Sequence, residues 1–191
     1  DYLEKTNESY AVAKIAGIKL CSSYNFQYKL NYKCLMPCNS YGLNDNYDLQ
    51  TSHFFPALLR KIIEAARYKK NYIKIWGNGK ALREVIYSDD VAEACIFFLN
   101  KKTKDSVINI GTGVEKTINE YAKFIMTHLK LKLKIVHENR TFNGTYRKIL
   151  DCSVAKKYGW KHKTSLEKGL SSTINDYLGN YILKNKKIIN L

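Results

Sequence analysis

The side chains best suited to chemistry lie near the start of the chain, in the segment Tyr10-Ala11-Val12-Ala13-Lys14. If this segment is helical, the phenol and the ammonium share one face, because residues four apart are neighbours on a helix. An ammonium close to a phenol favours the phenolate. Such a tyrosine can donate a proton to a carbonyl oxygen as hydride arrives, while the lysine holds a ribose hydroxyl. The same spacing occurs by chance on many helices, so an ordinary helix face is equally open.

Three other positions could contact a ligand. The segment Pro37-Cys38-Asn39-Ser40 follows an expected strand, at the kind of sheet edge where open α/β proteins bind ligands. An ordinary turn explains that segment equally well. His53 lies at the start of an expected helix that has Pro56 in its first turn. Without further context it is only a polar residue at the beginning of that helix. Trp76 ends an expected strand, where core packing and ligand contact are both open.

The elements that must position these residues alternate between strand and helix, which predicts an α/β protein with a mainly parallel sheet. Gly77-Asn78-Gly79 between two strands indicates a hairpin or near-hairpin, and 39–46 has the composition of a loop. Ser88-Asp89-Asp90 is a helix-starting cluster, and Thr117 with Glu120 fits a capping box. Helices are expected over 9–29, 53–68, 88–99, 117–129, 153–159 and 164–183, and strands over 32–36, 72–76, 83–87, 107–110 and 134–137.

Composition excludes several classes of protein. With 45% hydrophobic and 26% charged residues the chain is not disordered or collagen-like. The longest apolar stretch, Ala94–Leu99, falls far short of the roughly 20 residues that a spanning helix needs. The net charge of +15 comes mostly from scattered lysines, which favours a solvated basic surface over a nucleic-acid site, although attraction for anionic small molecules is expected. The five irregularly spaced cysteines predict reduced thiols in a cytosolic protein and no structural metal.

Longer stretches of the sequence resemble one family. The Tyr–Lys pair is common to a whole superfamily, whereas Ser52–Leu59 and Gly144–Lys148 are much narrower signals. The resemblance is to the GDP-L-fucose synthases, which are extended short-chain dehydrogenases/reductases, and it covers roughly residues 8–180 in collinear order. The stretches that carry it are Tyr10–Ile18, Met36–Gly42, Asn44–Asn46, Ser52–Lys61, Trp76–Gly79, Arg83–Asp90, Asn109–Gly113 and Gly144–Asp151.

The resemblance implies the C-terminal part of a Rossmann-type doubly wound parallel sheet with a smaller α/β substrate-binding domain. Residues 1–52 and 88–112 would form the remaining part of the NADP-binding domain. Residues 53–87 and 113–185 would form the GDP-sugar domain, and 186–191 a loose tail. It further implies a cytoplasmic homodimer without a nucleic-acid or membrane partner.

The implied activity is the 3,5-epimerisation of GDP-4-keto-6-deoxy-D-mannose, followed by reduction at C4 with NADPH to give GDP-L-fucose. Tyr10 would protonate the C4 oxygen, Lys14 would support Tyr10 and bind the nicotinamide ribose, and His53 would be the general acid of the epimerisation. Cofactor contacts would come from Lys14, Pro37, Cys38, Asn39, Ser40 and His53, and substrate contacts from Lys61, Trp76, Arg83, Asn143 and Arg147.

The chain also departs from this pattern. It opens without Met and lacks the Gly-rich phosphate loop, the catalytic Ser and the catalytic Cys, so it is expected to be a fragment that is inactive alone. Asn143 stands where the family often has Asp, Lys61 where a relative can carry Arg, and Tyr146 replaces a frequent Pro without an expected consequence. Three alternatives stay open: another NAD(P)-dependent sugar-nucleotide epimerase or dehydratase, a non-catalytic dimerisation piece, and, remotely, a basic nucleic-acid-binding module.

Overall fold

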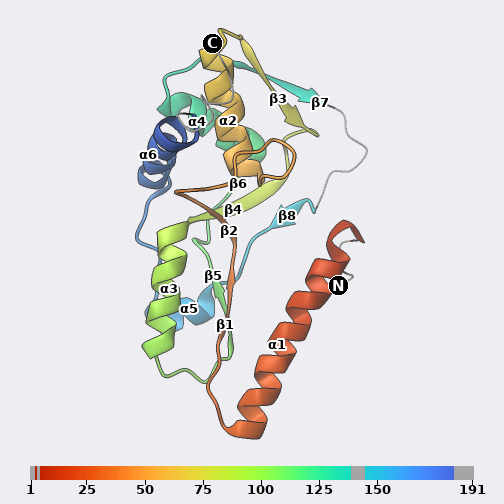
Figure 1. Cartoon of the computed structure of the whole chain (residues 1–191), viewed down its shortest axis with the longest axis vertical. Helices are drawn as coiled ribbons and strands as arrows, with labels where there is room; N and C mark the ends of the chain where they lie inside the picture. The colour runs from red at the N-terminus through yellow and green to blue at the C-terminus, as the bar shows by residue number, and fades with distance from the viewer. Residues whose placement is uncertain (1–2, 4, 139–144, 183–191) are drawn as a thin grey trace.

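The computed structural model describes residues 3, 5–138 and 145–182 of the chain. Its body is an α/β structure in three tiers, and one long helix lies apart from them (Figure 1). The lowest tier is the parallel pair β1 (Cys34–Pro37) and β5 (Val107–Ile110), with α3 (Ser88–Asn100) and α5 (Ser153–Lys157) beside it. The core of this tier consists of Ile86, Ala94, Phe98, Ile108, Ile110, Ala155 and Trp160.

The middle tier is organised around β4 (Leu82–Tyr87). This strand runs parallel to β2 (Asn39–Tyr41) and β8 (Arg147–Lys148) and antiparallel to β6 (Glu115–Thr117). Residues 85–87 of β4 are buried, which anchors the strand between the tiers above and below it. β4 therefore connects segments that lie far apart in the sequence.

The upper tier contains the parallel pair β3 (Tyr72–Trp76) and β7 (Lys134–Glu138). Alternating burial along β3, with Ile73 and Ile75 inside, turns one face of this pair toward α2 (Phe54–Arg67) and α4 (Ile118–His128). The helix α6 (Leu166–Asp176) and the π-helical segment Tyr177–Ile182 lie beside this tier, and their buried Leu170, Ile174 and Tyr177 belong to its core.

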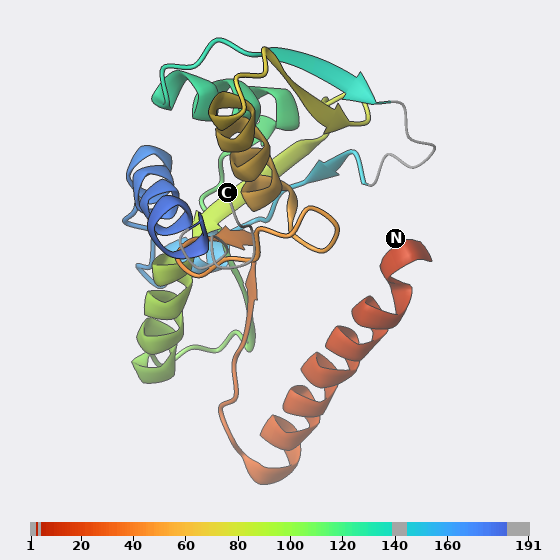
Figure 2. The ribbon, with the colours of Figure 1, turned by 45° about the horizontal axis from the view of Figure 1, so that its top comes forward.

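α1 (Glu8–Tyr28), which follows a short 3-10 helix at Lys5–Asn7, has no buried residue. Its apolar side chains are distributed around the helix and do not form one seam: Tyr10, Val12, Ile15, Leu20, Tyr24, Phe26 and Tyr28 are all exposed. Figures 1 and 2 both show α1 standing apart from the body and joined to it through the segment that leads into β1. Among the described residues, none lies in a helix both long and apolar enough to span a membrane.

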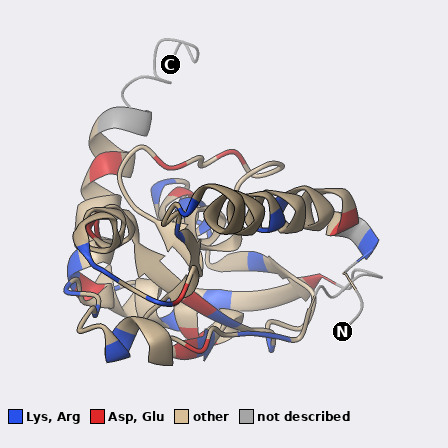
Figure 3. Ribbon diagram, turned by 90° about the horizontal axis from the view of Figure 1, so that it is seen from below, with Lys and Arg blue, Asp and Glu red and all other residues tan. Residues whose placement is uncertain are grey.

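The charged residues do not gather on one side of the fold. In Figure 3 lysine and arginine occur on helices, strands and loops, with aspartate and glutamate between them. Some of these neighbours pair, as Lys74 does with Glu138 and Lys163 with Glu93. In the part of the chain that the structure describes, basic side chains therefore form no single patch in this view.

The predicted hairpin around Gly77-Asn78-Gly79 is wrong. Gly77 and Gly79 both adopt positive φ, and the Gly77 N–H donates to the Glu138 carbonyl, so the chain turns away from β3 after Trp76. β3 pairs with β7, while β4 pairs with β2, β6 and β8. The predicted loop at 39–46 is also partly wrong, because Asn39–Tyr41 pairs with Val85–Tyr87 as a strand.

The structure differs from the sequence-based expectation in the capping of one helix and in the C-terminal end of another. α3 begins at Ser88 as predicted, but no side chain caps it; the Asp90 carboxylate instead accepts N–H groups of Lys163 and Thr164. The last helix, expected to continue to 183, is α-helical only to Asp176 and then widens into the π-helical segment. At the start of α3, the Asp90 carboxylate binds backbone N–H groups of a distant loop instead of those of its own helix, and the local sequence does not predict this.

The capping box at Thr117 is confirmed, and it gives a stability test. The Glu120 N–H donates to Thr117 Oγ1 over 3.1 Å, and the Thr117 N–H donates to Glu120 Oε2 over 2.7 Å. Thr117→Ala should lower the free energy of unfolding by about 1 kcal/mol, because the first turn of α4 loses its acceptor. Urea denaturation measures this. Thr117→Ser keeps the hydroxyl and serves as control; equal losses in both variants would contradict the capping role.

Candidate functional site

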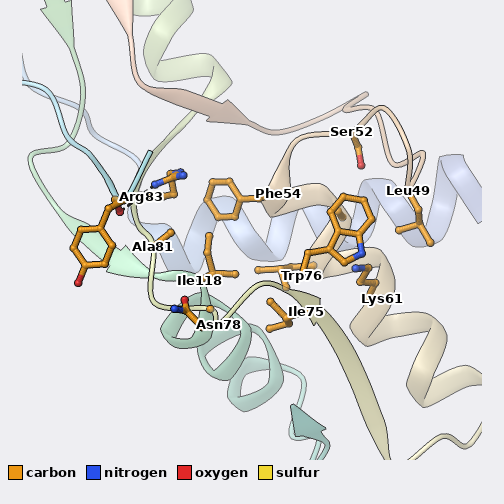
Figure 4. Close-up of a pocket in the computed structure, with 14 residues that line it drawn as sticks. Leu49, Ser52, Phe54, Lys61, Ile75, Trp76, Asn78, Ala81, Arg83 and Ile118 are labelled. Atoms are coloured by element: carbon orange, nitrogen blue, oxygen red, sulfur yellow. Dashed lines mark hydrogen bonds between the residues drawn. The ribbon is translucent and has the colours of Figure 1, made fainter. Parts of the chain in front are cut away.

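The main cavity of the described chain has a volume of about 590 Å³ and lies between the start of α2, the end of β3 and the start of β4 (Figure 4). Its apolar wall comes from Phe54, Leu58, Ile75, Ala81 and Ile118. The polar side chains between these apolar residues include those of Ser52, Lys61, Asn78 and Arg83. A mostly apolar cavity with a few placed polar groups is the usual form of a small-molecule site.

Lys61 and Trp76 lie together in this cavity. Their elements pack on each other, and the Lys61 Nζ atom lies 4.7 Å from the centroid of the Trp76 ring. The same ammonium donates to the Lys74 carbonyl over 3.0 Å, which holds it against β3. Trp76 is 45% exposed as a residue, so the cavity presents a positive charge beside a partly accessible aromatic side chain.

Arg83 supplies a second positive charge from β4. Its Nη1 donates to the Leu82 carbonyl over 2.8 Å and to the Tyr146 carbonyl over 3.4 Å. Burial lowers the pKa of Arg83 from its ordinary value, but a guanidinium keeps its charge in proteins. Two cations and an indole around one cavity suit a ligand that combines negative charge with a planar ring.

The structure places Tyr10 and Lys14 on one face of α1, as their spacing predicts. The Lys14 Nζ atom lies 5.3 Å from the centroid of the Tyr10 ring. Both side chains are exposed, and neither lines the main cavity. The pair therefore forms on α1, the helix that stands apart from the body in Figure 2, while Lys61, Trp76 and Arg83 line the cavity.

His53 is the N-cap residue of α2 and lies just outside the helix, with extended backbone and an exposed side chain. Its neighbours Ser52 and Phe54 line the cavity, whereas His53 does not. The Asp45 carboxyl is close enough to His53 to interact with it electrostatically. Burial raises the pKa of that carboxyl, and the Asn46 N–H and nearby His53 partly oppose the rise.

The segment Pro37-Cys38-Asn39-Ser40 lies at the carboxyl end of β1, which runs parallel to β5. The Cys38 N–H donates to the Ile110 carbonyl, and the Asn39 amide donates to the Glu84 carbonyl over 3.0 Å. Burial, together with the charge of Glu84, raises the pKa of the Cys38 thiol well above its usual range, so Cys38 is a neutral thiol and no ionised nucleophile. Pro37 and Ser40 are exposed at this edge.

Comparison with known proteins identifies the family. The model described as the NAD dependent epimerase/dehydratase family matches residues 1–111. The chain belongs to this family. It is 42% identical over 182 residues to putative GDP-L-fucose synthase 2 of Arabidopsis thaliana, covering 95% of this chain and 56% of that protein. It is 43% identical over 187 residues to GDP-L-fucose synthase of Escherichia coli K12, covering 93% and 58%.

A solved structure extends this similarity to three dimensions. The GDP-mannoheptose C4 reductase from Campylobacter jejuni with NADP bound is 31% identical, with a TM-score of 0.78 over 92% of this chain and 61% of that one. The fold is therefore the NAD(P)-binding α/β fold of the epimerase/dehydratase family, as the sequence predicts. The chain spans a little over half the length of the curated relatives it matches.

Not every predicted substrate residue of this epimerase/dehydratase chain reaches the cavity. Arg147 does not line it; both Nε and Nη2 face Glu115, at 2.9 and 2.8 Å, and this pairing raises the pKa of Arg147. Asn143 lies outside the described residues. Tyr146 also lines the cavity, although its replacement of a frequent Pro predicts no consequence for the chemistry. The feature that could have indicated a binding role is an aromatic side chain within the narrow 144–148 motif.

No group of three or more His, Cys, Asp or Glu residues that could hold a metal ion occurs among the described residues.

Proposed function

We propose that the chain is a portion of a GDP-L-fucose synthase, which converts GDP-4-keto-6-deoxy-D-mannose to GDP-L-fucose with NADPH, and that it contains the substrate-binding site and part of the NADP-binding domain. The observation that carries the proposal is the cavity in which Lys61, Trp76 and Arg83 meet. These are three of the residues that the resemblance assigned to the GDP-sugar. Identities of 42–43% to GDP-L-fucose synthases support the same assignment.

In this proposal each cavity residue has a chemical task. Arg83 and Lys61 hold the diphosphate, because guanidinium and ammonium groups donate charge-assisted hydrogen bonds to phosphate oxygens. The exposed face of Trp76 packs against a planar or sugar ring. The apolar wall around Ile75 and Ile118 removes water, which strengthens these electrostatic contacts.

The residues present fit the nicotinamide end of NADPH. Lys14 offers an exposed ammonium over the Tyr10 ring, and the 37–40 segment offers Pro37, Asn39 and Ser40 at the carboxyl end of a parallel strand. When bound, NADPH supplies hydride. Tyr10 would give its proton to the C4 oxygen of the sugar, and Lys14 would hold the ribose and stabilise the charge left on Tyr10.

His53 would move the proton in the epimerisation at C3 and C5. The C4 ketone acidifies the neighbouring C–H bonds, so the step requires a group that gains and loses a proton near neutral pH, and imidazole is such a group. The position of His53 supports this role, because it is exposed beside two residues that line the cavity. Asp45 provides a nearby carboxylate.

The remaining parts of the proposal concern organisation. Residues 1–52 and 88–112 would belong to the NADP-binding domain, and 53–87 and 113–185 to the substrate domain. The protein would be cytoplasmic and would form a homodimer through α1, whose apolar side chains are exposed in the single chain although they do not form one seam. The alternative is a C4 reductase, which is the activity that the C. jejuni relative is named for. If this chain belonged to an enzyme that only reduces C4, the complete protein would not exchange deuterium at C3 and C5, so that measurement separates the two.

GDP binding tests the cavity directly. Titration calorimetry of the 191-residue chain with GDP should show one saturable site, and Trp76→Ala or Arg83→Ala should weaken it about tenfold or more through lost stacking or charge. Tyr72→Ala is the matched control, because Tyr72 is another exposed aromatic residue of β3 that does not line the cavity. Absence of saturable binding by the wild-type chain, or equal effects of Trp76→Ala and Tyr72→Ala, would overturn the assignment.

A further inference from the structure

Glu84 is a fully buried carboxylate in β4, directly after the cavity residue Arg83. A buried charge is costly unless hydrogen bonds satisfy it. Oε1 of Glu84 accepts the backbone N–H groups of Thr112 and Gly113 over 2.6 and 2.7 Å, and Oε2 accepts the Leu150 N–H over 3.0 Å. The Thr112 hydroxyl adds a longer bond of 3.3 Å. Both carboxylate oxygens are thus engaged by donors from other segments.

These donors belong to two separate segments of the chain. Thr112 and Gly113 follow β5, whereas Leu150 follows β8. A third segment joins through the backbone, because the Glu84 carbonyl accepts the Asn39 amide. β4 itself pairs with both β2 and β8. One residue therefore ties the expected cofactor segment to the segment that carries Tyr146.

The carboxylate has little room to adopt another position. A Cβ atom added at Gly111 would collide with the Glu84 carboxylate and come close to the Cys152 sulfur. The glycine is thus required for close approach of the backbone to Glu84. Burial, and then the charge of Glu84, raises the pKa of Cys152 to about 11, so the neighbouring thiol is neutral and brings no second charge.

The bond to Leu150 bears on the main cavity through Tyr146. The segment 146–150 is attached to β4 at two points: the Leu82 N–H donates to the Tyr146 carbonyl over 2.8 Å, and Glu84 accepts from Leu150 at the other end. Between them, Arg147 and Lys148 pair with β4. With both attachments in place, Tyr146 and Arg83 line the same cavity.

We propose that Glu84 is a positioning residue for the nucleotide site: its carboxylate fixes the 146–150 segment so that Tyr146 closes one side of the cavity, and its carbonyl orients Asn39. The inference rests on the proposed function, since it takes the cavity to be the GDP site. Glu84 itself does not line the cavity and acts through the residues it holds. Supporting residues of this kind determine how well a site is preorganised.

The test combines amide exchange with GDP titration in the 191-residue chain. In the wild type without GDP, the amides of Thr112, Gly113 and Leu150 should already be protected from hydrogen exchange. In Glu84→Gln one acceptor becomes an NH₂ donor facing a backbone N–H, so exchange at these amides should rise while core amides of Ile62 and Ile125 stay protected. GDP should bind the folded variant about tenfold more weakly.

Glu93→Gln is the matched control, because it makes the same chemical change in an ion pair of α3 with Lys163. It should change neither readout. Equal GDP affinity in Glu84→Gln and wild type overturns the positioning role alone, whereas a wild type that does not bind GDP overturns the proposed function and the positioning role with it. If Glu84→Gln does not fold, the wild-type exchange decides: a rapidly exchanging Leu150 amide overturns the proposal.

Discussion

Replacing Tyr10 with phenylalanine in the complete protein is expected to lower the rate of C4 reduction about 10²–10⁴-fold, the usual contribution of a positioned acid. The variant keeps the aromatic ring and lacks only the hydroxyl that would protonate the C4 oxygen. Tyr10 is exposed on a helix without buried residues, so the change should leave the fold intact. The measurement is NADPH oxidation with GDP-4-keto-6-deoxy-D-mannose. Proton exchange at C3 and C5 should persist, because it requires no hydride.

Tyr24→Phe provides the comparison for this variant. Tyr24 also lies on α1 and is exposed, but its ring lies near those of Tyr28 and Tyr32, whereas the ring of Tyr10 lies under Lys14. It should reduce the keto sugar at the wild-type rate. If Tyr10→Phe retains more than about a tenth of the wild-type rate, the hydroxyl is not the proton donor.

The sequence predicts elements well where the signal is local. The strand Tyr72–Trp76 is found at the predicted residues, and the Thr117–Glu120 capping box forms as its spacing indicates. Strand pairing is not local. β3 pairs with β7, about 60 residues further along the chain, and nothing in the Gly77-Asn78-Gly79 turn distinguishes that outcome from a hairpin. The same limit explains why the composition of 39–46 predicts a loop although Asn39–Tyr41 is a strand: its partner β4 lies in a distant segment.

The candidate site shows the same difference between local features, which the sequence predicts, and long-range contacts, which it does not. The types of Lys61, Trp76 and Arg83 indicate anion and ring recognition, and the structure brings them to one cavity. Glu84 carries no such signal, because a glutamate within an apolar strand reveals neither its burial nor its donors. Those donors come from the segments after β5 and β8, and only the three-dimensional packing brings them together. Sequence thus identifies side chains that can face a ligand, but not Glu84, the residue proposed to fix the 146–150 segment beside them.

Replacing His53 with asparagine should lower deuterium incorporation at C3 and C5 of the keto sugar about 10²–10⁴-fold. Asparagine can hydrogen-bond but cannot give or take a proton near neutral pH. The fold should tolerate the change, because His53 is the exposed N-cap residue of α2, makes no side-chain cap bond, and asparagine is favoured at that position. Incorporation is followed by NMR in D₂O with the complete protein.

His137→Asn is the matched control, since His137 is another exposed histidine and its ring contacts Asn119 at 3.0 Å. It should exchange deuterium at the wild-type rate. Because Tyr10 and His53 lie on different elements, α1 and the start of α2, their variants should separate the two reactions: Tyr10→Phe loses reduction and keeps exchange, whereas His53→Asn loses exchange. Wild-type exchange in His53→Asn would remove its proton-transfer role. Loss of exchange in both variants would mean that one residue supports the other, and the two steps would then share a single proton path.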